Sequence, residues 1–100
     1  MPFLYLTTKG WKTGKPHEIE IWYVELGGSY YMVAELRQRS HWVQNIQRDP
    51  KVRFIVNKKK LEGKARIVDP NGEPELVGRV TQEMDKQYDW SDGTIVELRP

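Results

Sequence analysis

Two arginines and a serine stand just before a predicted helix in "ELRQRSHWVQNIQRDPKV", residues 35–52. Arg37, Arg39 and Ser40 precede His41, and no acid follows in the first helical turn. Ser40 is a good N-cap, but the positive end of a helix dipole disfavours cations, so this arrangement favours a bound anion. Guanidinium groups bind phosphate or carboxylate in bidentate fashion, which makes the segment a candidate anion site. In the alternative interpretation the arginines are simply exposed or pair with acids of the chain: Glu18, Glu20 or Glu35.

A second basic segment, "GWKTGK" at residues 10–15, lies between two glycines. Lys12 and the Thr13 hydroxyl can both donate to a phosphate or carboxylate. The spacing is not that of a P-loop, and composition alone favours a solvated hairpin tip. Both interpretations stay open for this turn.

Aromatic side chains are abundant for a chain of this length. They could line a site for a flat ring, although in a small barrel most large rings belong to the core. Trp42, one turn from the arginines, is the best candidate to serve both purposes. The aromatic set comprises Trp11, Trp22, Tyr23, Tyr30, Tyr31, Trp42, Tyr88 and Trp90.

Self-sufficient catalysis finds little support in the residue types. There are no cysteines, and His17 and His41 lack metal-ligand spacing with acids. No G-x-S-x-G motif is present, so an enzyme of this sequence would need a cofactor for its chemistry. A net charge of +2 does not by itself indicate nucleic acid, and no apolar run approaches a membrane helix. We expect a cytoplasmic protein with no transmembrane segment.

The elements that must position these residues follow from periodicity and turn signals. Strands are predicted over 3–8, 17–26 and 29–35, with a hairpin turn at the two glycines 27 and 28. A helix begins after Ser40 and ends before Pro50, and a second begins at Pro74 and carries Tyr88. Further strands are expected over 51–56, 61–69 and 93–99. The order βββαββαβ predicts one domain over residues 1–100, a mainly β, small antiparallel barrel with two helices at its openings.

Two motifs of the sequence resemble those of a known family. The chain resembles the deazaflavin-dependent nitroreductases, which are split β-barrel proteins related to flavin-binding barrels. Two motifs carry the similarity, one running from "LTTKG" to the proline of "KTGKP" and the other being "WVQNIQRDPKV". The matching positions are Leu6 to Gly10, Lys12 to Gly14, Pro16, Gly27 to Gly28, Trp42, Asn45, Ile46, and Asp49 to Val52.

The resemblance implies an FMN-binding-type split barrel that uses coenzyme F420, or alternatively FMN. It implies hydride transfer from the reduced cofactor to an electron-poor acceptor such as a quinone or nitro compound, with Tyr88 as a candidate catalytic residue. Lys12, Arg37, Arg39 and Ser40 would hold the phosphate or acidic tail. The implied cofactor-binding residues are Trp11, Lys12, Thr13, His17, Ile21, Val33, Ala34, Glu35, Arg37, Arg39, Ser40, His41, Trp42 and Asn45.

We also expect a homodimer, because a chain this small buries only a modest core. A different class of function stays open beside the enzyme: a cofactor carrier without catalysis, or a small-barrel module that binds nucleic acid through basic turns and exposed rings.

Overall fold

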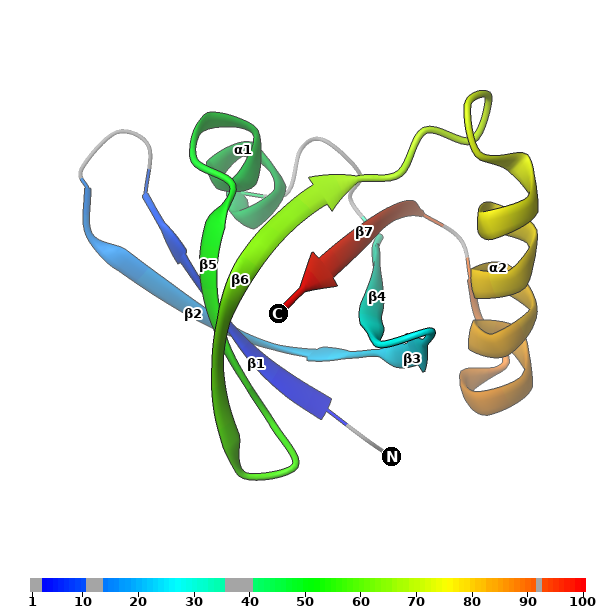
Figure 1. The fold of residues 1–100 in the computed structure, drawn as a ribbon, viewed down its shortest axis with the longest axis horizontal. Coiled ribbons are helices and arrows are strands. Elements are labelled where there is room, and N and C mark those ends of the chain that lie inside the picture. Colours follow the sequence, from blue (N-terminus) through cyan, green and yellow to red (C-terminus); the bar gives the residue numbers. More distant parts are fainter. Residues whose placement is uncertain (1–2, 11–13, 36–40, 92) are drawn as a thin grey trace.

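The computed structural model describes residues 3–10, 14–35, 41–91 and 93–100. Within them, seven strands form one antiparallel sheet that curls into a half-barrel, in the order β2-β1-β5-β6-β7-β4-β3 (Figure 1). Two helices accompany the sheet in this described part, which confirms the predicted mainly β split barrel. The elements are β1 (Phe3–Lys9), β2 (Pro16–Trp22), β3 (Val24–Leu26), β4 (Ser29–Ala34), α1 (His41–Arg48), β5 (Lys51–Val56), β6 (Lys59–Ile67), α2 (Pro74–Tyr88) and β7 (Thr94–Arg99).

The predicted strand over 17–26 is in fact two strands that meet at Tyr23. β2 pairs with β1, from Trp22 opposite Phe3 to Pro16 opposite Lys9, whereas β3 pairs with β4. These two strands are at opposite ends of the sheet order although a single residue separates them in the chain. The backbone around Tyr23 therefore links the two edges of the sheet and forces the sheet to curl.

Two tight turns close hairpins of the sheet, and the first of them is the one that the sequence predicts at its glycine pair. Gly27 and Gly28 have φ values of 59° and 85° between β3 and β4. Asn57 and Lys58 have φ values of 51° and 65° between β5 and β6. Two-residue hairpins favour positive φ at both central positions because this matches the twist of the strands. Glycine adopts that conformation without strain, whereas Lys58 does not.

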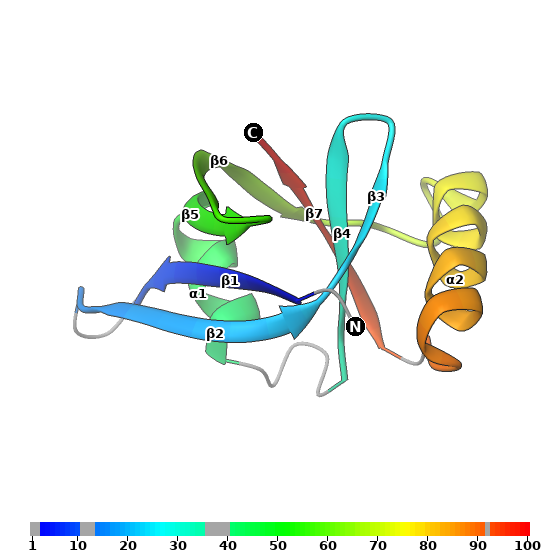
Figure 2. The ribbon, with the colours of Figure 1, turned by 90° about the horizontal axis from the view of Figure 1, so that it is seen from below.

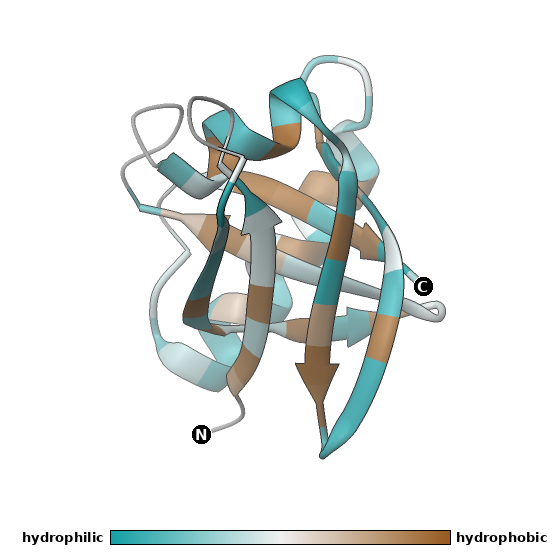
Figure 3. Cartoon of the chain, turned by 90° about the vertical axis from the view of Figure 1, so that its left-hand side faces the viewer, coloured by the Kyte–Doolittle hydropathy of each residue, from teal (hydrophilic) through white to brown (hydrophobic). Residues whose placement is uncertain are grey.

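The core divides into two clusters of buried apolar side chains. The larger fills the barrel and includes Leu6 and Phe54 from the strands, with Val43 and Ile46 from α1. The smaller joins α2 to the sheet through Val80 and Met84. Figure 2 shows the two helices on opposite sides of the molecule. Buried and exposed residues alternate along β1 and β5, as expected for a sheet with one buried face, and Figure 3 shows bands of hydrophobic and hydrophilic residues along the strands at the front.

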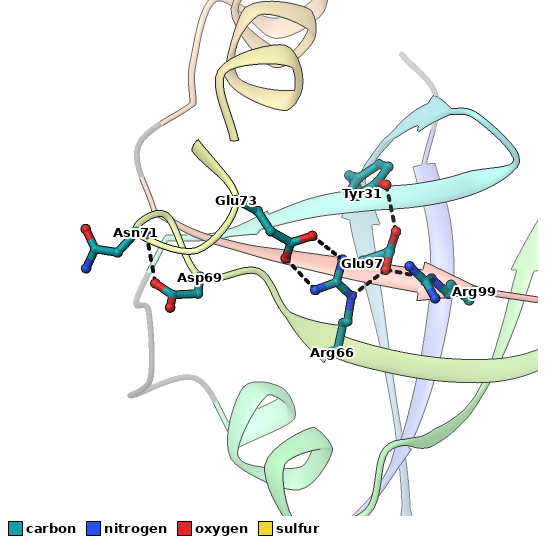
Figure 4. Close-up of polar contacts among 7 residues, drawn as sticks. All are labelled: Tyr31, Arg66, Asp69, Asn71, Glu73, Glu97 and Arg99. Atoms are coloured by element: carbon teal, nitrogen blue, oxygen red, sulfur yellow. Dashed lines mark hydrogen bonds and ion pairs between the residues drawn. The ribbon is translucent and has the colours of Figure 1, made fainter. Parts of the chain in front are cut away.

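A charged network fixes the start of α2 to the sheet (Figure 4). Glu97 of β7 is 2% exposed and accepts hydrogen bonds from the Tyr31 hydroxyl at 2.7 Å and Arg66 Nε at 2.6 Å. Arg99 Nε donates to the same carboxylate at 2.9 Å. Arg66 also donates twice to Glu73, at 2.5 and 2.9 Å, immediately before Pro74. Three strands and the beginning of α2 are thereby joined through one arginine and one buried carboxylate.

The protonation states in this network follow from its contacts. Burial by itself raises the pKa of Glu97, but the hydrogen bonds from Tyr31 and Arg66 outweigh it, so the pKa lies below its ordinary value. The hydrogen bonds from Arg66 likewise lower the pKa of Glu73. Burial, and then the bond to Glu97, raises the pKa of Tyr31, so its hydroxyl keeps its proton and donates.

No helix in the described segments is long and apolar enough to cross a membrane.

Candidate functional site

A cleft of about 620 Å³ opens where the barrel is split, between β2, the end of β4, α1 and the end of α2. Its volume falls within the range of roughly 300 to 1,000 Å³ that is typical of small-molecule sites. Most of the lining is aromatic or aliphatic. The lining residues are Phe3, Ile19, Glu20, Ile21, Trp22, Val33, Ala34, Glu35, Trp42, Met84, Tyr88 and Trp90.

One wall of the cleft is a stacked pair of aromatic rings. Trp22 ends β2 and Tyr88 ends α2, and their ring centroids lie 4.8 Å apart with 7° between the planes. The Tyr88 hydroxyl donates to the backbone carbonyl of Tyr23 at 2.5 Å. Burial raises the pKa of Tyr88, so the hydroxyl stays protonated. The pair is therefore a rigid wall whose only hydroxyl is already engaged by the backbone.

A second wall is the backbone edge of β2. Ile19, Glu20, Ile21 and Trp22 all line the cleft, although consecutive residues of a strand point to opposite faces. Both faces contribute only where the strand edge itself borders the cleft. Within the described sheet β2 pairs with β1 alone, so its other edge is turned towards this space. Such an edge presents N–H and C=O groups to a ligand.

The end of β4 forms the floor. Val33 and Ala34 pair with Ile95 and Thr94 of β7, which fixes their backbone. Gly93 packs directly against this end, since a Cβ there would lie 2.3 Å from the carbonyl oxygen of Ala34. Only a residue without a side chain permits this close approach.

The structure brings six of the predicted site residues together around the cleft. Ile21 comes from β2, Val33, Ala34 and Glu35 from the end of β4, Trp42 from α1 and Tyr88 from α2. Three other predicted residues lie outside it: His17, His41 and Asn45. His17 and His41 are exposed, on β2 and at the start of α1.

Asn45 has a contact within the protein instead. Its side chain is 3% exposed and donates from Nδ2 to the Thr8 hydroxyl at 3.0 Å, which ties α1 to β1. This contact indicates a structural role. The remaining predicted residues, Trp11, Lys12, Thr13, Arg37, Arg39 and Ser40, lie outside the described residues.

Sequence reasoning assigned no specific role to several residues that line the cleft. Trp22 and Trp90 were part of the aromatic set, and Tyr88 was placed on the second helix, but nothing in the sequence joins that helix to β2. Phe3, Ile19 and Glu20 carry no signal beyond strand alternation. The remaining aromatic candidates behave as expected of core residues: Tyr23 and Tyr31 are buried, and Tyr30 packs against Phe54.

Comparison with solved structures shows the fold: this split barrel is similar to that of a FAD-binding protein and of an F420-dependent reductase, among others. A FAD-binding protein of Mesorhizobium loti is 12% identical, with a TM-score of 0.74 and coverage of 98% of this chain and 80% of that one. Rv2991, a conserved hypothetical protein of Mycobacterium tuberculosis, is 24% identical, with a TM-score of 0.74 and coverage of 100% and 72%. An F420-H2-dependent reductase, FDR-A, is 23% identical, with a TM-score of 0.66 and coverage of 98% and 94%.

The family match is more specific than the similarity of fold. Residues 1–97 match the family of F420H(2)-dependent quinone reductases, and the chain belongs to that family. It is accordingly an oxidoreductase whose cofactor is coenzyme F420, in place of the FMN considered as an alternative. Membership of an enzyme family sets aside the alternative of a carrier without catalysis. No curated protein sequence matches the chain significantly.

Proposed function

We propose that the protein transfers a hydride from reduced F420 to a flat, electron-poor acceptor, such as a quinone or a nitro compound, inside the aromatic cleft. The observation that carries the proposal is the lining of that cleft, which combines a stacked Trp22–Tyr88 wall with the backbone edge of β2. When bound, the cofactor supplies the hydride. The chain supplies the surfaces that hold two flat rings against each other.

The cleft residues fit a tricyclic ring in shape and chemistry. Ile21 and Ala34 offer apolar contact from two sides, and the β2 edge offers backbone donors and acceptors to a polar ring edge. Aromatic and aliphatic walls keep water off the faces of stacked rings, which protects a hydride donor from side reactions, while the open mouth of the cleft leaves water at the ring edges. Hydride transfer requires donor and acceptor atoms to approach to roughly 3 to 3.5 Å, and stacking between rigid walls favours that approach.

The anionic part of the cofactor is proposed to bind the two basic segments. Residues 36–40 stand between Glu35, which lines the cleft, and His41 at the start of α1. Arg37, Arg39 and Ser40 on this segment, together with Lys12 from the turn at 11–13, supply the donors that a phosphate requires. Trp11 and Thr13 flank Lys12 on that turn and belong to the same proposed site, and His17 and His41 follow the two segments in the chain.

Tyr88 is proposed to act as a wall of the site and not as a proton donor. Its hydroxyl already donates to the Tyr23 carbonyl, and its ring stacks on Trp22. Reduction of a quinone to a hydroquinone takes up one hydride and one proton. The cleft opens to solvent, and we propose that water delivers the proton.

We also propose that the protein acts as a cytoplasmic homodimer with one domain over residues 1–100. The absence of cysteines fits a reducing compartment. A solved structure described as a domain-swapped dimer is 23% identical to the chain, with a TM-score of 0.68 and coverage of 98% and 80%. The similarity to a dimeric relative supports the dimer for this chain.

The decisive experiment has a binding step and a turnover step. Oxidised F420 is titrated into purified protein and the quenching of tryptophan emission is followed, since Trp22, Trp42 and Trp90 line the cleft. Reduced F420 is then mixed with menadione or a nitroaromatic compound, and its oxidation is compared with a reaction lacking protein. Saturable binding together with catalysed oxidation is expected. Binding without oxidation of any acceptor would refute the proposed reaction.

The basic segment is tested separately. Arg39→Ala is expected to weaken F420 binding by about tenfold to a hundredfold, because a charged hydrogen bond to phosphate is worth roughly 1.5 to 3 kcal/mol. Lys86→Ala, on the exposed side of α2, is the matched control. Unchanged affinity in Arg39→Ala would remove the helix start from the proposed site.

A further inference from the structure

The aromatic cleft has a negatively charged border. Of the described residues that line it, the two with charged side chains are Glu20 on β2 and Glu35 directly after β4. Both are exposed, so their carboxylates belong to the open part of the cleft. No lysine or arginine of the described ranges lines the cleft. A ligand that enters therefore meets two acids together with aromatic rings.

Glu20 stands beside the stacked wall of the cleft. It shares a face of β2 with Trp22, because residues two apart on a strand point to the same side. On that face the register sets Tyr5 directly opposite Glu20, and the next residue along β2 is another acid, Glu18. Neither neighbour neutralises a carboxylate. Glu20 and Glu35 form no ion pair with any cation in the described part of the chain.

The rings and the acids of the cleft favour the same sign of ligand charge. The face of an indole or phenol ring carries negative potential and attracts a cation within about 6 Å of its centre. Trp42 and Trp90 add such rings to the stacked pair. Apolar walls of low dielectric constant also concentrate the field of the two carboxylates inside the cleft. A positively charged ligand is therefore attracted, and a negatively charged one is repelled.

We propose that Glu20 and Glu35 select the acceptor by its charge. The favoured acceptor is a flat, electron-poor ring with a positively charged substituent, such as a quaternary ammonium group. A ring that carries a carboxylate or sulfonate is rejected. This inference rests on the proposed function, because it names the class of acceptor for that reaction.

The positive charge belongs on a substituent and not on the ring that accepts the hydride. A cationic ring loses its charge when it takes up a hydride, so acids beside it would stabilise the ground state more than the transition state. A charged substituent keeps its charge throughout. Its attraction to the two carboxylates is then the same before and during the reaction, which lowers KM and does not change kcat.

Three nitrobenzenes that share one ring test the proposal. At pH 7, 4-nitrobenzyltrimethylammonium is a cation, 4-nitrobenzyl alcohol is neutral and 4-nitrobenzoate is an anion. Saturable quenching of tryptophan emission in the full chain, corrected with free tryptophan, gives each dissociation constant. At about 20 mM salt the cation is expected to bind at least about tenfold more tightly than the anion, and at about 0.5 M salt only about threefold.

Removal of each carboxylate locates the effect. Glu20→Gln and Glu35→Gln change the charge with little change in shape, and each is expected to reduce the preference for the cation over the anion by about threefold. The double variant should lose the preference almost completely, by about tenfold. Glu18→Gln is the matched control, because Glu18 lies on the same strand and face but does not line the cleft.

Two results would overturn the proposal. One is a native protein that binds the cation no more tightly than the anion, or that shows no saturable binding of the cation. The other is a loss of preference in Glu18→Gln as large as that in Glu20→Gln, which would indicate an effect of net charge and not of the cleft. Far-ultraviolet circular dichroism checks that every variant is folded.

Turnover of the same compounds separates this proposal from the proposed function. The nitro group takes up one hydride from reduced F420 and one proton from water, and yields a nitroso group and one molecule of water. For the cation, Glu20→Gln should raise KM by about threefold without a change in kcat.

The two proposals can fail independently. A preference for the cation that depends on Glu20, in a protein that never oxidises reduced F420, would sink the reductase function and leave the selection by charge standing. Oxidation of reduced F420 by all three compounds, with KM values independent of their charge, would do the opposite.

Discussion

The indole of Trp22 and the phenol of Tyr88 are stacked almost in parallel, with 7° between their planes, although they are 66 positions apart in the chain. One residue ends an edge strand and the other ends a helix, so the contact fixes the end of α2 against the open edge of the barrel. The shape of the cleft depends on this contact, because both rings line it.

The first prediction separates the ring of Tyr88 from its hydroxyl. Tyr88→Phe loses the hydrogen bond to the Tyr23 carbonyl, and we expect a stability loss of about 1 kcal/mol with kcat unchanged within about threefold. Tyr88→Leu also loses the stacked ring, and KM for the acceptor is expected to rise by up to about tenfold. Steady-state kinetics with reduced F420 and menadione measures kcat and KM for both variants. If Tyr88→Phe alone reduces kcat by more than about a hundredfold, the hydroxyl is a proton donor after all.

A second prediction concerns Gly93 behind the end of β4. In Gly93→Ala the new methyl group would lie 2.3 Å from the Ala34 carbonyl oxygen, so the end of β4 must shift. We expect F420 affinity to fall by about tenfold and stability to fall by about 1 to 3 kcal/mol. Gly78→Ala is the control, since the space around Gly78 is open and alanine favours the helix by roughly 1 kcal/mol. Native affinity in Gly93→Ala would show that the β4 end does not contact the cofactor.

A third prediction follows from the buried carboxylate of Glu97. The folded state lowers its pKa below the ordinary value of 4.5, so the unfolded chain takes up a proton first as pH falls. The stability contributed by Glu97 is therefore complete above pH 4.5 and disappears as pH falls through the lower, folded-state pKa. Glu97→Gln is expected to lose about 2 to 3 kcal/mol at pH 7 and to show a flatter acid dependence.

Urea unfolding between about pH 3 and pH 7 measures this difference. Glu62→Gln, at an exposed position of β6, is the control and should follow the native curve. Parallel acid profiles for Glu97→Gln and the native protein would contradict the prediction.

The fourth prediction concerns the turn between β5 and β6. Lys58 adopts a φ of 65°, which costs a residue with a side chain roughly 1 kcal/mol. Lys58→Gly should therefore raise the free energy of unfolding by about 0.5 to 1 kcal/mol. Lys59→Gly, which places the same substitution within β6, should lower it. Thermal unfolding measures both, and destabilisation by Lys58→Gly would show that its side chain makes a contact worth more than the strain.

Much of the fold could be predicted because its signals are local. Asp49 before Pro50 ended α1, Pro74 opened α2, and the glycine pair at 27–28 closed a hairpin. The break at Tyr23 was not predicted, because the apolar run Trp22, Tyr23 and Val24 is compatible with one continuous strand. In the structure the buried positions shift by one there, since Tyr23 and Val24 are buried in succession. Only the pairing of β1 with β2 and of β3 with β4 reveals the division.

The candidate site, like the fold, could be predicted from the sequence only where the signal is local or part of a motif. Ile21, Val33 and Trp42 were placed by resemblance to a family motif, and the structure puts them around one cleft. Trp22 and Met84 come together only through the packing of α2, which depends on distant contacts. The buried Glu97 lies within the apolar run "TIVELR". A charged residue in such a run indicates that the charge is paired. Its partner Arg66 cannot be identified from sequence spacing alone.

The pairing of β4 with β7 has a consequence for synthesis of the chain. Val33 and Ala34 at the floor of the cleft are held by Ile95 and Thr94 of β7, which leave the ribosome well after β4 itself. The Tyr31–Glu97 bond spans 66 positions. Long-range pairings of this kind form slowly, because closing a large loop costs chain entropy before any stabilising contact is made. The nascent chain can form its β1–β2 and β5–β6 hairpins early, but it acquires a cleft only when β7 has emerged.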